Sequence, residues 1–163
     1  GYDTLLEVGV LLLALIAAWT VAPRSNEELE RSPSPALQTI VRLVLPIIIL
    51  GAGYFLWIGS YAPGGAFQAG AILGGGLVLL ILAGSKRTAA ICSNRQLLAF
   101  GLIVFLLIAI IPMMLGNRLL EFPEGTDKVL ILVIETAATI SIGLTLAALF
   151  LGAPMLRKPK LAT

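Results

Sequence analysis

Three carboxylates lie within long apolar runs or at their edges, where a charge is costly. Glu135 stands inside the run 129–143, so at about 1.5 Å per residue it lies roughly 10 Å from the start of its helix. Asp3 and Glu7 are four residues apart and share one face of a first helix. A carboxyl inside a bilayer is protonated, paired or turned toward water. These residues therefore predict either proton or cation handling, or neutralisation by a Lys, Arg or hydroxyl of a neighbouring subunit.

Small and polar residues surround Glu135 along its helix. A helical projection places Thr136, Thr139 and Gly143 on the same side as Glu135, which makes a stripe suited to a helix interface. Lys128 falls on nearly the same side two turns outward, within reach of a water-bridged contact. The candidate residues of a proton or cation path are Glu135, Glu7, Asp3, Thr139 and Lys128.

The sequence lacks the residue sets that enzymes use. It contains no histidine, which removes the commonest metal ligand, and its single Cys92 forms no internal disulfide. It shows no nucleophile–base pair, no metal-ligand set and no phosphate-binding loop. We therefore predict no catalytic residue, no metal, no cofactor and no nucleic-acid partner, and we expect that the protein is not an enzyme.

The elements that position these residues are apolar and of membrane-spanning length. The chain of 163 residues is 58% hydrophobic and 12% charged, whereas soluble proteins are about a quarter charged. A span takes about 20 apolar residues, and five runs qualify, at 4–22, 38–59, 64–84, 96–115 and 128–152. The sequence predicts an all-α polytopic membrane protein with five transmembrane helices. Pro46 and Pro112 lie inside two of these runs and predict kinks.

The charges divide the chain and orient it. The polar stretch 23–38 separates the first run from the others, and its Pro, Ser and charged residues predict a solvated loop, with a short surface helix from Asn26 as the alternative. We predict an N-terminal transmembrane helix at 1–23, a cytoplasmic linker at 24–37, a four-helix membrane domain at 38–154 and a basic cytoplasmic tail at 155–163. Nine of the eleven basic residues fall on the side of the linker, the 85–95 loop and the C-terminus. The positive-inside rule then places the C-terminus in the cytoplasm and Gly1 outside.

A glycine-rich segment follows the turn between the second and third runs. Pro63 fits the first position of a helix, where its missing N–H costs nothing. Ala66, Gly70 and Gly74 are spaced by four, as are Ala71 and Gly75, which makes two faces of small residues. Such faces allow close approach of another helix. The segment thus predicts a tight helical hairpin with close packing.

The segment 60–67, SYAPGGAF, resembles the G-H-N-x-P-G-G-G-F signature of the B subunit of multisubunit monovalent cation/proton antiporters (Mrp, also called Mnh). The resemblance extends over about 36–154 and includes Glu135, where the family carries an acidic residue in its last helix. Ser60 and Tyr61 replace the His-Asn pair and Ala66 replaces the third glycine, so any role of that histidine is unsupported here. The motif and packing residues of this region are Pro63, Gly64, Gly65, Phe67, Gln68, Gly70 and Gly74.

The first seven residues, GYDTLLE, resemble the F-D-T-x-x-E start of the last helix of the A subunit in the same systems. In membrane-bound hydrogenases that helix is part of a small separate subunit. The two resemblances imply an accessory subunit of a Na⁺/H⁺ antiporter module in the cell (inner) membrane. Its partners would be other membrane subunits, lipid, a monovalent cation and protons. An antiporter-like subunit of a redox-driven complex and a purely structural scaffold remain open alternatives.

Overall fold

The computed structural model describes residues 2–21, 34–59, 61–114 and 127–152. These residues form helices joined by turns, and no strand occurs among them. The all-α class is therefore confirmed for this part of the chain. Asn26, where we expect a loop or a short surface helix, lies outside the described residues. The helices are α1 (Tyr2–Val21), α2 (Pro35–Ile58), α3 (Ala66–Leu82), α4 (Lys86–Cys92), α5 (Arg95–Met114) and α6 (Asp127–Leu151).

Each of the five predicted runs forms a helix, but the helices differ in length. Three are long and apolar enough to cross a membrane: Asp3–Val21, Pro35–Ile58 and Lys128–Leu151. Helices α4 and α5 meet at a bend of 47° and together make a fourth candidate span. Helix α3 is apolar but shorter, with 17 residues. The structure thus gives three or four candidate spans by length and composition, and the fifth remains a prediction.

The segment 85–95 is not the simple loop that we expected. Residues Lys86–Cys92 form α4, whose first turn is capped by Ser85. The Ser85 Oγ accepts a hydrogen bond from the backbone N–H of Thr88 at 3.3 Å, which satisfies one of the free N–H groups of a helix start. At the other end of α4, Cys92 is fully buried. A helix forms here because the cap and the buried thiol fix both of its ends.

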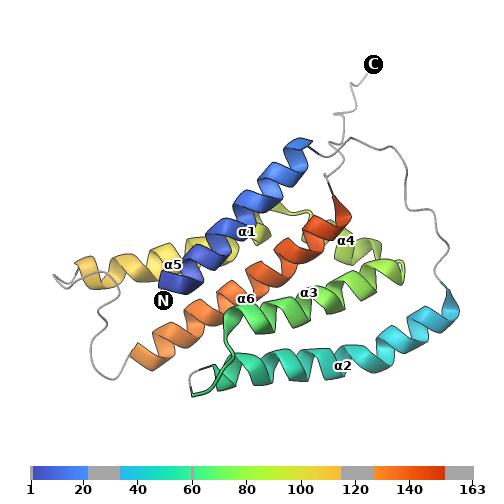
Figure 1. The fold of residues 1–163 in the computed structure, drawn as a ribbon, viewed down its shortest axis with the longest axis horizontal. Helices are drawn as coiled ribbons and strands as arrows, with labels where there is room; N and C mark the ends of the chain where they lie inside the picture. The colour runs from blue at the N-terminus through green and yellow to red at the C-terminus, as the bar shows by residue number, and fades with distance from the viewer. Residues whose placement is uncertain (1, 22–33, 60, 115–126, 153–163) are drawn as a thin grey trace.

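Helix α6 forms the centre of the bundle. It contacts every other helix, and Figure 1 shows it between α1 and α5 on one side and α3 and α2 on the other. About half of the residues in its most apolar stretch are buried, whereas few residues of α1 and α2 are buried. Its buried positions include Ala138, Gly143 and Ala147. Small side chains there let the backbones of the surrounding helices come close.

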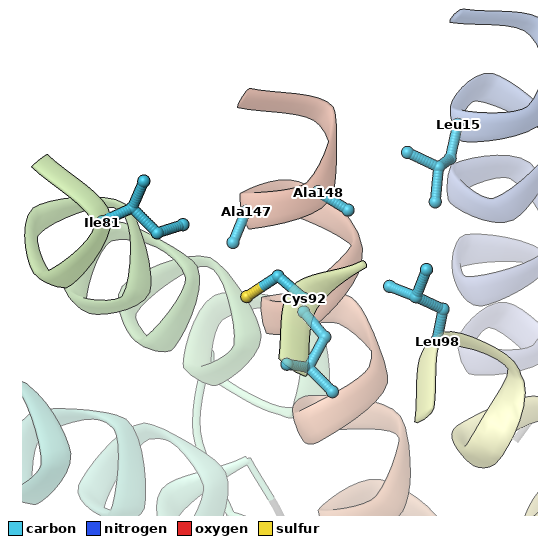
Figure 2. Packing of buried hydrophobic residues seen from close by; sticks show 7 residues of the cluster. Leu15, Ile81, Cys92, Leu98, Ala147 and Ala148 are labelled. Carbon is cyan, nitrogen blue, oxygen red and sulfur yellow. The ribbon is translucent and has the colours of Figure 1, made fainter. Parts of the chain in front are cut away.

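At one end of the bundle, residues from five helices form a hydrophobic cluster. Figure 2 shows Cys92 of α4 among Ile81 of α3, Ala147 and Ala148 of α6 and Leu98 of α5, with Leu15 of α1 on the far side. Trp19, also on α1, donates its indole N–H to the carbonyl oxygen of Gly152 at 2.9 Å. The last turn of α1 is thus tied to the last turn of α6.

Among the described prolines, one begins a helix and two lie inside helices. Pro35 is the first residue of α2, which therefore begins three residues before the predicted run. Pro46 and Pro112 lie inside α2 and α5, and each helix continues on both sides of its proline. The proline-rich segment before α2 falls among the residues 22–33, which the structure does not describe.

Candidate functional site

Helices α3 and α6 touch through glycine. A Cβ atom added to Gly70 would stand 2.7 Å from the Cβ of Ile142, and one added to Gly74 would stand 3.2 Å from the carbonyl oxygen of Gly143. In the other direction, a Cβ on Gly143 would lie 3.1 Å from the carbonyl oxygen of Gly70. The Ala66–Gly70–Gly74 face therefore packs against α6 within this chain. The two helices run in the same direction, because later residues of α3 meet later residues of α6.

The second small-residue face of α3 is turned outward. Ala71 and Gly75 are both exposed. A Cβ atom added to Gly75 would meet no other atom within 4 Å. The two faces that the sequence predicts alike thus have different surroundings, one filled by α6 and the other open.

The turn before α3 needs glycine at three positions. The N–H of Gly65 donates to the carbonyl oxygen of Phe55 at 3.0 Å, and its φ of 123° lies where side chains are strained. A Cβ on Gly64 would stand 2.7 Å from that same Phe55 oxygen, and one on Gly59 would stand 2.6 Å from the Cα of Gly65. The chain folds back onto the end of α2 so closely that only hydrogen fits.

Pro63 does not begin the helix, so this prediction was wrong. It is exposed in the turn, and α3 begins three residues later, after Gly65. The positive φ of Gly65 interrupts the right-handed helix at that point. Phe67 packs in the cluster that also holds Val8 of α1. Gln68 is exposed.

Thr139 joins α6 to the start of α3. Its hydroxyl is buried, with 3% of the side chain exposed. The Thr139 Oγ1 lies 2.7 Å from the carbonyl oxygen of Glu135 and 3.3 Å from that of Ala66. Its single hydrogen is shared between the two carbonyls. Glu135 lies one helical turn closer than Thr139 to the N-terminus of α6 and is half-buried.

Helix α1 brings a second carboxyl toward Glu135. Val8 packs against Ala138 of α6 in one cluster, and Leu5 packs against Ile134 in another. Glu7 lies between these two contacts and is exposed. Residues that are far apart in the sequence thus share one region of the bundle.

The other two candidate residues of the predicted ion path lie near the N-terminal ends of their helices. Asp3 is exposed in the first turn of α1, one helical turn before Glu7. Lys128 is exposed near the start of α6, two turns outward of Glu135. Across the described ranges, no three acidic, histidine or cysteine residues come together as a metal site would require. The arrangement offers isolated carboxyl, hydroxyl and carbonyl oxygens, which can take up a proton or a monovalent cation.

The contact between α5 and α6 was missed from the sequence. The Ser141 Oγ donates a hydrogen bond to the carbonyl oxygen of Leu98. A Cβ on Gly101 would stand 2.6 Å from the Cβ of Ser141 and 2.8 Å from the carbonyl oxygen of Ala137. Gly101 is the one glycine of α5, and that isolated glycine in a run of large side chains was the available signal.

A comparison with known protein families gives a match. The family model described as a domain related to the MnhB subunit of Na⁺/H⁺ antiporter matches residues 36–152. No curated protein and no solved structure matches the chain. The matched region holds the glycine turn, α3 to α6 and nearly all of α2, whereas α1 precedes it. The resemblance drawn from segment 60–67 is thus confirmed, and the chain is a membrane protein that belongs to the family with a domain related to the MnhB subunit of Na⁺/H⁺ antiporters.

Proposed function

We propose that this chain is an accessory, non-enzymatic subunit of a multisubunit monovalent cation/proton antiporter. The observation that carries the proposal is the match of residues 36–152 to the MnhB-related domain. The helix packing is consistent with a role inside a larger assembly, because much of the surface is apolar. Large side chains such as Leu43, Leu50 and Leu13 are about two-thirds exposed or more. Lipid or other membrane subunits must cover them.

The relative directions of the helices support five membrane passes. Helices α1, α3 and α6 run one way, as Trp19 meets Gly152 and Gly74 meets Gly143. Helix α5 runs the opposite way, because Leu98 contacts Ser141 while Phe105 packs near Ile134. In this proposal α3 is a short pass and α4 with α5 is a bent one. The distribution of basic residues then places Gly1 outside and the C-terminus in the cytoplasm.

Glu135 is the residue that we place on the ion path. Glu135 is half-buried, it lies one turn from the buried Thr139 hydroxyl, and α1, which carries Glu7, packs against the same part of α6. A carboxyl held within a membrane helix marks ion or proton pathways in many transport proteins. Glu135 alternates between a protonated state and a cation-bound state, and Glu7 tunes that exchange from α1. Other subunits supply the rest of the path.

The proposal is tested with Glu135→Gln in the intact complex. Inside-out membrane vesicles are energised to build a pH gradient, and the dissipation of that gradient on adding Na⁺ is measured. We expect the variant to assemble normally and to lose most of this cation-driven proton flux. Thr39→Ala is the control, since Thr39 is exposed on α2, away from Glu135, and donates to the Pro35 carbonyl oxygen of its own helix. Unchanged flux in Glu135→Gln would reduce Glu135 to a packing residue.

A structural scaffold is the second candidate function. It is favoured by the open face of Ala71 and Gly75, which could seat a helix of another subunit at close range. Under this alternative, Gly75→Leu disrupts the assembly while Glu135→Gln leaves transport unchanged. The redox-driven alternative depends on which other subunits the chain assembles with. Co-purification with a nickel–iron or formate-oxidising module would favour it over a free-standing antiporter.

A further inference from the structure

The C-terminal ends of α3 and α6, their inner ends on the proposed cytoplasmic side, pack side by side. Their N-terminal ends, the outer ends, do not lie at the same level. At the inner end, Ile81 of α3 packs with Ala147 and Ala148 of α6. At the other end, the first residue of α3, Ala66, meets Thr139. Helix α6 begins twelve residues before that point, at Asp127, which corresponds to about 18 Å of helix. In Figure 1 the start of α6 accordingly extends past the start of α3.

The outer part of α6 is covered on one side only. Leu5 of α1 and Phe105 and Ala109 of α5 pack around Ile134. Among the described residues, none covers the side of α6 that continues the α3 contact outward, because α2 and α3 end at the turn that hydrogen-bonds to Phe55. Because α6 extends beyond the turn between α2 and α3, the outer end of the bundle has a recess, which we call the step. Its floor is the turn 61–65 and its wall is the face of α6 formed by Lys128, Leu132, Glu135 and Thr136.

The residues of the step are open in the structure. On the floor, Tyr61 is 79% exposed, and Pro63 is also exposed. On the wall, Leu132 is 37% exposed, Thr136 is exposed, and Glu135 is half-buried. The surface thus combines a non-helical backbone, a carboxyl and a hydroxyl with a few apolar side chains.

Lipid is a poor occupant of this step. The hydrocarbon core is about 30 Å thick, whereas the 17 residues of α3 span only about 25 Å. Lys128, whose charge belongs at or outside the boundary of the hydrocarbon, stands eleven residues before Thr139 on α6, which is about 16 Å of helix. The turn directly precedes Ala66, which meets Thr139, so the turn lies below that boundary. Non-helical backbone at that depth is tolerated only where protein or a water-filled cavity covers it.

We propose that the step is the docking site for a transmembrane helix of a neighbouring subunit. This inference rests on the proposed function, since it assumes that the chain works inside a membrane complex. The docking helix carries at least one hydrogen-bond donor toward the step. Lys128 and the hydroxyls of Tyr61 and Thr136 can donate hydrogen bonds at the step. The donor of the docking helix is directed at the acceptors there, which are the carbonyl oxygens of the turn and the carboxyl of Glu135. The partner helix then lies beside Glu135 and completes its surroundings.

Photo-crosslinking in native membranes tests the docking site. The amino acid p-benzoylphenylalanine replaces Tyr61 on the floor or Leu132 on the wall of the full chain, within the intact complex. The same amino acid replaces Leu50 of α2 as the matched control, because Leu50 is 73% exposed on a continuous helix that lipid can cover. After irradiation, adducts are separated by electrophoresis and identified by mass spectrometry.

We expect both step positions to give an adduct with one and the same partner subunit, and Leu50 to give none. Three results would overturn the docking site: adducts confined to residues 116–126 of the same chain, adducts with a second copy of the chain, or no protein adduct at all. Equal crosslinking from Leu50 would also overturn it, because the step would then not be a preferred contact. As a second test, Thr136→Trp should greatly reduce the co-purified partner, whereas Leu50→Trp should not.

The two proposals can fail separately. Crosslinking at the step together with unchanged transport in Glu135→Gln would remove Glu135 from the ion path and keep the docking site. Loss of transport in Glu135→Gln without a crosslink at the step would keep the ion path and remove the docking site.

Discussion

The Thr139 hydroxyl and the carbonyl oxygen of Ala66 lie 3.3 Å apart, and this contact joins the first residue of α3 to the middle of α6. Ala66 is the first residue of α3, so one buried side chain marks the outer limit of that helix. Glu135 lies one turn farther out, just past this limit. The short α3 therefore leaves the Glu135 side of α6 open, and the same contact explains both the step and the accessibility of the carboxyl.

Thr139→Val removes this hydrogen bond while nearly keeping the side-chain volume. We expect a small destabilisation, about 0.6 kcal/mol, which is the average for hydrogen bonds between membrane helices. Thr139→Ser is the control that restores the hydroxyl. Thermal unfolding of the purified complex in detergent gives the comparison. Equal stability of the Val and Ser variants would show that the hydroxyl does not hold α3 in place.

Gly70→Ala should destabilise the bundle by about 1–3 kcal/mol, the usual cost of overpacking. Its new Cβ would stand 2.7 Å from two carbon atoms of Ile142, so α3 and α6 would have to move apart. Gly75→Ala is the matched control on the same helix, since its Cβ would meet nothing within 4 Å. Thermal midpoints of the two variants should differ clearly. Similar midpoints would contradict the close packing of these helices.

Gly65→Ala should also destabilise, for a different reason. The φ of 123° at Gly65 is unfavourable for any residue with a side chain, at a cost of about 1–3 kcal/mol. Gly53→Ala in α2 is the control, because its Cβ would be in open space and its backbone is helical. The yield of monodisperse protein and its thermal midpoint are the measurements. A Gly65→Ala protein as stable as Gly53→Ala would mean that the turn adopts another conformation.

Trp19→Phe removes the indole N–H that binds the Gly152 carbonyl oxygen. The expected loss is about 1 kcal/mol, typical of one intramolecular hydrogen bond. Trp57→Phe is the same substitution at a side chain that is 65% exposed, and it should be close to neutral. Chemical denaturation in detergent measures both. A larger loss for Trp57→Phe would argue against the anchoring of α1 at this end.

The sequence predicted where the apolar helices lie, because apolar runs of membrane length form helices in lipid. It predicted five spans, whereas the structure gives three or four candidate spans. It did not predict α4, since its seven residues depend on the Ser85 cap and on the burial of Cys92. It also placed the start of α3 too early, at Pro63. The positive φ of Gly65 and its bond to Phe55 arise from the fold of the turn, which the local pattern does not specify.

The candidate site was predictable only in part. The sequence singled out Glu135 and Glu7 by their apolar surroundings, but only the packing of α1 on α6 places them in one region. It described two equal small-residue faces on α3, and the structure fills the Gly70 face while leaving the Gly75 face open. Which face packs depends on the partner helix, and that information lies far away in the sequence.

The most direct test compares Glu135→Asp with Glu135→Gln in complexes reconstituted into proteoliposomes. Cation-driven proton flux is measured under an imposed pH gradient, with assembly checked by the co-purified subunits. If the carboxyl is part of the ion path, the Asp variant keeps a substantial share of the flux, because it keeps an exchangeable carboxyl. The Gln variant then loses most of the flux. Wild-type flux in Glu135→Gln, in a fully assembled complex, would contradict the role proposed for this residue.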